Sequence, residues 1–252
     1  MIRGAKIWAL VVGILVALVA AQGATAETDW RGVPTKTIPA ARRSALRKAL
    51  ATAMDSIPAP PAPYALRPKE STFEVDAKAP WDRKTAKWWD PARAAAERYY
   101  EVPADAAGLT EERRNLLGPI EVRVELNGEL KIGDLGSEGG AQTLFPIPDA
   151  VAVEVTTIAP GEAGGRVAAM TPEQADYRLT ALTVVLGDEL LEASARRLGR
   201  EVPGEQWGGV SVWTADPAEV RHVFVRIHGP KKPVEDFARR IPTAALRRLL
   251  RG

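Results

Sequence analysis

The clearest pattern in the chain is a strict alternation of apolar and charged residues over positions 120–126. Apolar side chains occupy the even positions and charged ones the odd positions: Ile120, Val122, Val124 and Leu126 against Glu121, Arg123 and Glu125. A period of two predicts a strand with one buried face and one exposed, charged face. Asn127-Gly128 then favours a turn, and a three-residue loop with a bulge pairs Val124 with Leu130 and Val122 with Ile132. We therefore expect a hairpin over 120–132.

Further strands and helices follow in an order typical of α+β proteins. Strand character recurs at 150–158, 179–186, 209–214 and 220–228, and helical signals span 188–198, 232–240 and 243–250. From Leu179 onward the order is strand, helix, strand, strand, helix, which is most of a ferredoxin-like unit. That order predicts an antiparallel sheet with helices packed on one face. Because this architecture supports many unrelated activities, it implies none of them.

The sequence predicts a mainly helical segment over residues 27–117, before the sheet. Helices are expected from Pro39 to Asp55, from Pro91 to Glu101 and from Thr110 to Leu117, each with a favourable first residue. The proline-rich run 57–64 is more typical of a stiff connector than of a ligand for a proline-recognising groove. Gly118-Pro119 then marks the main boundary, which divides the chain into a segment 27–117 and an α+β domain 118–252.

The first 26 residues have the pattern of a secretory signal peptide. A short basic start with Arg3 and Lys6 precedes an uncharged apolar run from Ile7 to Ala20. Ala24-Thr25-Ala26 supplies the small residues of a cleavage site, so the mature chain is expected to begin at Glu27. The alternative is an uncleaved anchor helix, but the apolar run is short for the roughly 20 residues that a span requires. We expect a periplasmic or secreted protein.

Composition narrows the class of protein further. The chain of 252 residues contains no cysteine, which excludes disulfides, cysteine-ligated metals and thiol catalysis. An exported protein without cysteine fits a bacterial cell envelope. The whole chain has 34 Lys and Arg against 32 Asp and Glu, and the excess of two is Arg3 and Lys6. The mature protein is therefore neutral, and general nucleic-acid binding is disfavoured.

This neutrality conceals a separation of charge along the chain. Residues 118–230 hold 9 basic and 17 acidic side chains, whereas residues 231–252 hold 7 basic and 2 acidic ones. The favoured interpretation is that the basic C-terminal segment packs against its own acidic domain. The alternative is weak contact between this C-terminal helix and an anionic membrane surface.

Recognisable catalytic motifs are absent from the sequence. Ser137 lacks the glycine spacing of a nucleophile elbow, and no glycine-rich phosphate or dinucleotide loop occurs, so no cofactor is expected. The two histidines, His222 and His228, lie on one predicted strand about 20 Å apart, which argues against a shared metal ion. Asp134 and Glu138 flank loop glycines and could form the carboxylate pair of a hydrolase, but spacing alone selects no pair.

The strongest candidate for ligand binding is an aromatic and basic cluster in the N-terminal segment. Its members are Trp81, Lys84, Trp88, Trp89 and Tyr99. Flat indole faces beside lysines suit a glycan, but the same residues also suit packing of this segment on the sheet, and packing is the favoured interpretation. Adjacent Trp88 and Trp89 point in different directions, so at least one is expected in the core.

These observations predict the general role but not the ligand. The favoured hypothesis is an exported cell-envelope protein that acts as a non-catalytic binding or structural accessory, with an envelope protein or glycan as its partner. A carboxylate-dependent hydrolase of an envelope polymer is the first alternative. A membrane-surface protein that uses its basic C-terminal helix is the second.

Overall fold

The computed structural model describes residues 28–29, 32–67, 72–132, 140–157, 178–200, 206–208 and 213–250. The predicted signal peptide and its cleavage site lie outside these residues, as do Asp134 and Glu138. Within the described part of the chain, no helix combines the length and the apolar character needed to cross a membrane.

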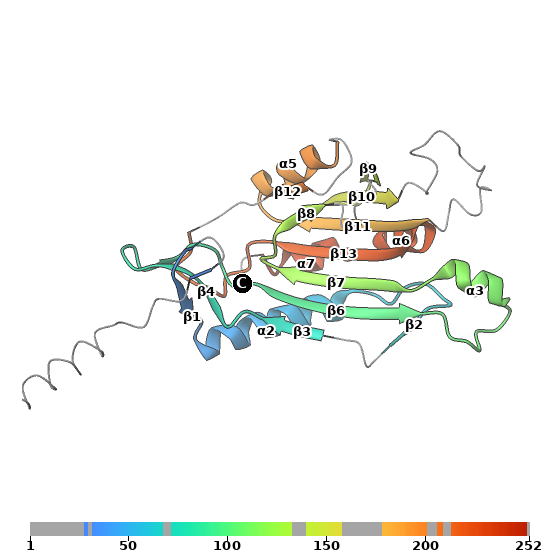
Figure 1. Cartoon of the computed structure of the whole chain (residues 1–252), viewed down its shortest axis with the longest axis horizontal. Helices are drawn as coiled ribbons and strands as arrows, with labels where there is room; N and C mark the ends of the chain where they lie inside the picture. Colours follow the sequence, from blue (N-terminus) through green and yellow to red (C-terminus); the bar gives the residue numbers. More distant parts are fainter. Residues whose placement is uncertain are drawn as a thin grey trace, which may run out of the picture.

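One large antiparallel sheet forms the centre of the molecule (Figure 1). Its strands run in the order β2-β6-β7-β13-β11-β10-β9, and β3 also pairs with β6. The bounds are β2 Ala65–Leu66, β3 Thr72–Val75, β6 Ala94–Glu101, β7 Ile120–Leu126, β9 Gly140–Phe145, β10 Val151–Thr157, β11 Leu179–Leu186 and β13 Val223–Pro230. The predicted strands at 120–126, 150–158, 179–186 and 220–228 are therefore confirmed in outline.

Two small sheets accompany the large one. The first contains β1 (Thr35–Thr37), β4 (Lys78–Asp82) and β5 (Lys87–Trp88), and the second pairs β8 (Leu130–Ile132) with β12 (Gln206–Gly208). The predicted hairpin over 120–132 is wrong, because β8 pairs with β12 and not with β7. Both edges of β7 are already occupied, by β6 on one side and by β13 on the other.

Helices cover the sheet on both of its faces, but not evenly. The helices are α2 (Ala40–Ser56), α3 (Glu111–Leu117), α5 (Glu189–Leu198), α6 (Lys231–Ala238) and α7 (Thr243–Arg247). Buried residues of α2, α6 and α7 share one core cluster with the central strands, whereas α5 packs over β10 and β11 on the opposite face. The α+β class, an antiparallel sheet with helices packed against it, is confirmed.

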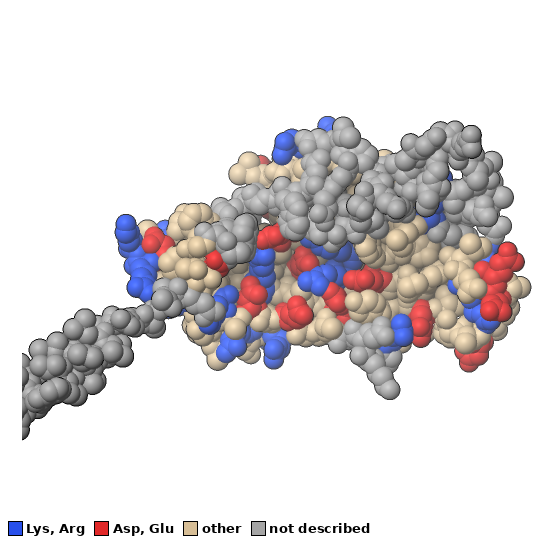
Figure 2. Space-filling model, viewed as in Figure 1, with Lys and Arg blue, Asp and Glu red and all other residues tan. Residues whose placement is uncertain are grey.

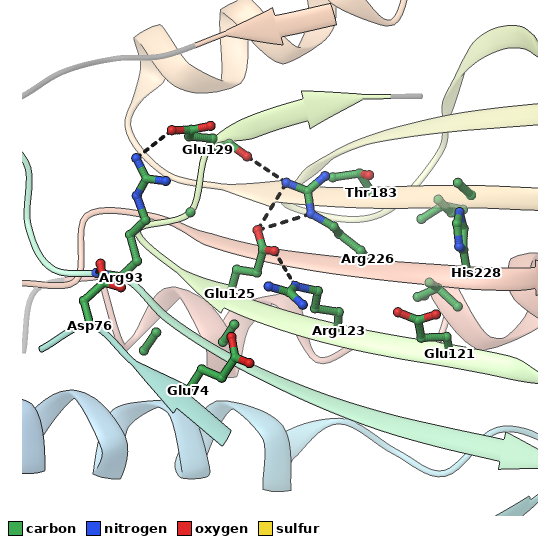
Figure 3. A pocket seen from close by; sticks show the side chains of 16 residues that line it. Glu74, Asp76, Arg93, Glu121, Arg123, Glu125, Glu129, Thr183, Arg226 and His228 are labelled. Atoms are coloured by element: carbon green, nitrogen blue, oxygen red, sulfur yellow. Dashed lines mark hydrogen bonds and ion pairs between the residues drawn. The ribbon is translucent and has the colours of Figure 1, made fainter. Parts of the chain in front are cut away.

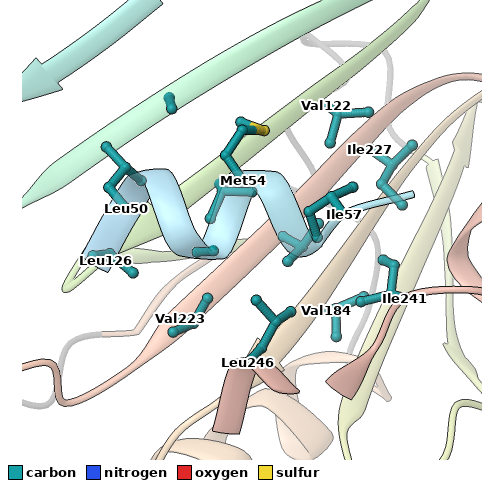
Figure 4. Packing of buried hydrophobic residues seen from close by; sticks show 14 of the residues in the cluster. Leu50, Met54, Ile57, Val122, Leu126, Val184, Val223, Ile227, Ile241 and Leu246 are labelled. Atoms are coloured by element: carbon teal, nitrogen blue, oxygen red, sulfur yellow. The ribbon is translucent and has the colours of Figure 1, made fainter. Parts of the chain in front are cut away.

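The main core forms where α2, α6 and α7 meet the apolar rows of the central strands. Val122 of β7, Val225 of β13 and Val184 of β11 are all fully buried on this face. Figure 4 shows Leu50 and Met54 of α2 over these strands. Because side chains alternate along each strand, this single packing contact fixes which residues face the other way.

The N-terminal segment differs from the prediction. Residues 91–101 were expected to be helical, but Ala94–Glu101 is strand β6, which pairs along its length with β7. Its alanines favour a helix locally, yet the pairing partner and the alternate burial of Ala94, Ala96 and Tyr100 impose a strand. Residues 27–117 thus contribute strands as well as helices, and they share a sheet and a core with residues after 117. The predicted helices over 39–55 and 110–117 are confirmed as α2 and α3.

Replacing Leu50 with alanine tests this core directly. Leu50 is fully buried, so Leu50→Ala should lower the free energy of unfolding by about 2–5 kcal/mol through lost burial and a new cavity. Chemical denaturation followed by circular dichroism measures the change. The matched control is Leu190→Ala on α5, where the residue is 70% exposed and where we expect a change below about 0.5 kcal/mol. Equal effects in the two variants would contradict the packing described.

Candidate functional site

The polar rows of the central strands face away from the main core and line a hollow of about 460 Å³. β7 and β13 provide the middle of the hollow, β3 and β6 one side, and β11 the other, with the turn after β7 above (Figure 3). The charged lining residues are Glu74, Asp76, Arg93, Glu121, Arg123, Glu125, Glu129 and Arg226. Figure 2 shows acidic and basic side chains next to one another across this face. We call this site the hollow.

Alternating charges form a chain of ion pairs across the hollow, in which one link is a hydrogen bond to a main-chain carbonyl. Arg123 pairs with Glu97 and places its Nε 2.5 Å from Glu125 Oε1. The other oxygen of Glu125 lies 3.2 Å from Arg226 Nη2. This same Arg226 nitrogen donates to the Glu129 carbonyl at 2.7 Å. The chain fixes the position of its charged groups, because each is held by a neighbour of opposite charge.

Arg93 completes the chain at the turn, since its Nη2 lies 2.7 Å from Glu129 Oε1. At the other end, burial opposes the charge of Arg123, but hydrogen bonds and charges from Glu125 and Glu97 outweigh it and raise the pKa of Arg123. The guanidinium therefore stays charged, and its carboxylate partners Glu97 and Glu125 hold it in place.

A buried asparagine holds the turn that carries Glu129. The Asn127 side chain donates to the carbonyls of Ala92 at 2.9 Å and Glu219 at 2.8 Å, and accepts from Arg221 N–H at 2.8 Å. It thus ties β7 to the segments that precede β6 and β13. Asn127 also adopts a positive φ of 55°, a conformation that asparagine tolerates better than most residues.

Gly128 fixes the rest of the turn through its contacts with Glu125 and His222. A Cβ on Gly128 would lie 2.4 Å from Glu125 Oε2, so a side chain there would displace a carboxylate of the ion-pair chain. The Gly128 carbonyl lies 2.7 Å from His222 Nε2. Burial lowers the pKa of His222 despite that hydrogen bond, and the neutral ring donates from Nε2. The position of Glu129 is therefore determined by Asn127, Gly128 and His222 together.

The two histidines have separate environments. His222 precedes β13 and contacts the turn, whereas His228 lies within β13, in register with Glu121, and lines the hollow. Among the residues that the structure describes, no group of three or more potential ligands could hold a metal ion.

Two carboxylates at the end of β3 stand apart from the ion-pair chain. Glu74 lies on β3, Asp76 directly follows the strand, and both line the hollow. Asp76 accepts the Arg93 backbone N–H at 3.1 Å, and within the described residues neither carboxylate forms an ion pair. Desolvation by the surrounding protein, with a smaller contribution from the Glu74 charge, raises the pKa of Asp76 against the effect of Arg93.

The residues predicted from sequence to bind a ligand lie in two places. Trp81 and Trp88 are opposite each other on β4 and β5, and Lys84 is exposed in the turn between these strands. Trp88 is buried, as expected for at least one of the adjacent pair, and Trp89 packs against Trp213 with ring centroids 4.9 Å apart. The structure therefore brings the tryptophans and Lys84 together, but not around a described cavity.

Tyr99 is not part of that cluster. It lies on β6, where its hydroxyl donates to Glu97 Oε2 at 3.0 Å, next to the ion-pair chain. The sequence pattern alone indicates an ordinary exposed strand face for Glu121, Arg123 and Glu125, and it does not single out Arg226. The sequence signal for Arg226 was its position between Val225 and Ile227, where a charge alternates with apolar residues on a second strand.

Comparison with protein-family models, characterised proteins and solved structures gives no significant match.

Replacing Asn127 tests the construction of the turn. Asn127→Ala removes three hydrogen bonds and leaves buried backbone groups without partners, so the free energy of unfolding should fall by about 2–4 kcal/mol. Asn127→Gly, which relieves the positive φ but also loses the bonds, should be less damaging than alanine. Exposed Asn115→Ala on α3 is the control. If Asn127→Ala matched this control in a urea titration, the turn would not depend on the side chain.

The raised pKa of Asp76 predicts that the stability of the protein depends on pH. Because the pKa of Asp76 in the folded protein lies above the ordinary 3.8, ionisation of Asp76 lowers the free energy of unfolding. Asp76→Asn keeps an oxygen that can accept from Arg93 N–H, so this variant should melt at the same temperature as the parent near pH 3 and above it at pH 7. The difference should grow as pH rises through the folded pKa. Melting curves from pH 3 to 8 measure it, and a variant less stable at pH 7 would contradict the assignment.

Proposed function

We propose that this chain is an exported binding protein of the cell envelope and that the hollow is its ligand site. The observation that carries the proposal is the chain of ion pairs that fixes charged groups around a cavity of about 460 Å³. Sites for small molecules and short polymer segments commonly measure about 300–1,000 Å³. Positioned polar groups around such a space supply orientation and specificity.

The charge of the lining supports a cationic ligand. Five carboxylates and three guanidiniums line the hollow, which gives a formal charge of −2 with histidine neutral. The arginines are committed to Glu97, Glu125 and Glu129, so Glu74 on β3 and Asp76 directly after it are left to face an incoming ligand. An ammonium group is the natural partner for these two carboxylates. Within a cell envelope, amine-bearing peptides and amino sugars provide such groups.

The experiment is isothermal titration of the full chain with two amine probes, trilysine and a fully deacetylated glucosamine hexamer. N-acetylated forms of both probes serve as matched ligands without the charge. At least one amine probe should bind, its acetylated form should not, and Glu74→Gln with Asp76→Asn should weaken binding about 10–100-fold. The control is Glu111→Gln with Glu112→Gln, a pair of exposed acidic residues on α3, which should bind like the parent.

Two results would oppose this proposal in different ways. Equal binding of the amine and acetylated probes would show that the hollow is not the ligand site. Unchanged binding in the variant with Glu74→Gln and Asp76→Asn would show the same. Cleavage of an envelope polymer that stops in Asp76→Asn would favour the hydrolase instead. That alternative has one supporting observation, the raised pKa of Asp76 beside Glu74, which is the pattern of a general acid next to a second carboxylate.

A further inference from the structure

A second surface, independent of the hollow, is strongly basic. Residues 36–48 and 78–87 together contain nine Lys and Arg and a single acidic residue, Asp82. We call these two stretches the basic end. The mature protein as a whole is neutral, so this local excess of eight positive charges is offset elsewhere in the molecule.

The fold brings the two stretches together. β1 pairs with β4, with Thr37 opposite Lys78, and the chain passes from β1 directly into α2. Figure 1 shows β1, β4 and the start of α2 at one end of the molecule, and Figure 2 shows basic side chains gathered there. The excess of charge is therefore a property of one surface and not only of the sequence.

Six of these nine cations form no ion pair with any residue that the structure describes. Arg42 pairs with Asp216 at 3.0 Å, and Lys36 lies 4.1 Å from the centroid of the Trp81 ring. Six others form no ion pair within the part of the chain that the structure describes: Arg43, Arg47, Lys48, Arg83, Lys84 and Lys87. All but Arg43 are exposed, so their charge is directed at solvent or at a partner.

The basic C-terminal segment is different. Lys231 bridges Glu154 and Glu235 at 2.6 Å each, and Lys232 and Arg239 pair with Asp236 at 3.0 Å. Arg247 lies 2.5 Å from Glu192. This segment packs against its own domain, as the favoured interpretation of the sequence expected. Much of its positive charge is compensated within the protein.

An exposed aromatic side chain favours a lipid surface as the partner of the basic end. Trp213, 45% exposed, packs on Trp89 and is held beside β5 by the bridge between Trp88 and Thr214. Indole rings beside basic residues suit the headgroup region of a bilayer.

We propose that the basic end docks on the surface of an anionic lipid bilayer. Each Lys or Arg held near such a surface strengthens binding by about fivefold, and the effect fades beyond a Debye length of about 8–10 Å. The exposed turn between β4 and β5 carries Arg83 and Lys84, and Lys87 follows at the start of β5, so three of these charges lie within five residues. Docking would hold the hollow close to the membrane without occupying it.

The test is vesicle sedimentation of the full chain, with neutral phosphatidylcholine vesicles compared with vesicles that contain 30% phosphatidylglycerol. The neutral vesicles report any binding that does not depend on lipid charge. The triple variant Arg83→Gln, Lys84→Gln, Lys87→Gln should lose about tenfold or more of the binding to anionic vesicles and none of the binding to neutral ones. Added salt should weaken the parent far more than the variant.

The matched control removes three exposed arginines elsewhere, Arg196→Gln, Arg240→Gln and Arg248→Gln. It should bind anionic vesicles like the parent, and melting curves confirm that both triples are folded. Equal losses in the two triples would show that only total charge matters and would overturn the proposal. The proposal would also be overturned if the triple variant at Arg83, Lys84 and Lys87 bound anionic vesicles as well as the parent does. Binding of the parent to soluble polyphosphate but not to anionic vesicles would overturn it too.

Discussion

The structure depends on one constraint, the period-two alternation of side chains on β7 and β13. Their apolar rows are buried under α2, α6 and α7, so their charged rows must face the other way. There α5 packs mainly over β10 and β11, in a cluster that also takes in Phe224 of β13, and the charges of the central strands line the hollow. The burial that stabilises the fold and the charged groups that form the site are therefore two consequences of one pattern. A one-residue slip in either strand would exchange them.

Charged residues on a sheet face are stable when neighbouring strands supply complementary partners. Glu97, Arg123, Glu125 and Arg226 come from the adjacent strands β6, β7 and β13 and alternate in sign across them. The turn anchored by Asn127 adds Glu129, which reaches Arg93. This leaves a rigid set of paired charges and a small excess of negative charge on β3. Rigid, oriented charge around an open space is what a binding site for a polar ligand requires.

Much of the fold follows from local sequence patterns, and most of the site does not. The α+β class, the strand at 120–126 and the helix after Asp188 follow from periodicity and capping, since Asp188 accepts the Leu191 N–H at 2.8 Å. The strand β6 was missed because its alanines favour a helix until β7 pairs with them. The hollow was missed because Arg226 and Glu125 are 101 residues apart in sequence, and only strand order makes them neighbours. The aromatic cluster was visible in sequence, but the pairing of Trp88 with Thr214, 126 residues further along the chain, was not.

The central claim is that the charged face of the sheet binds an amine-bearing ligand. The most direct measurement is the change in backbone amide NMR shifts when the protein is titrated with the glucosamine hexamer and with trilysine. If the hollow is the ligand site, saturable shifts are expected at Glu74, at Asp76 and at the facing residues of β7 and β13, including Glu125, with little change at Trp89 and Trp213. Shifts confined to those tryptophans, or spread evenly over the acidic surface, would contradict it.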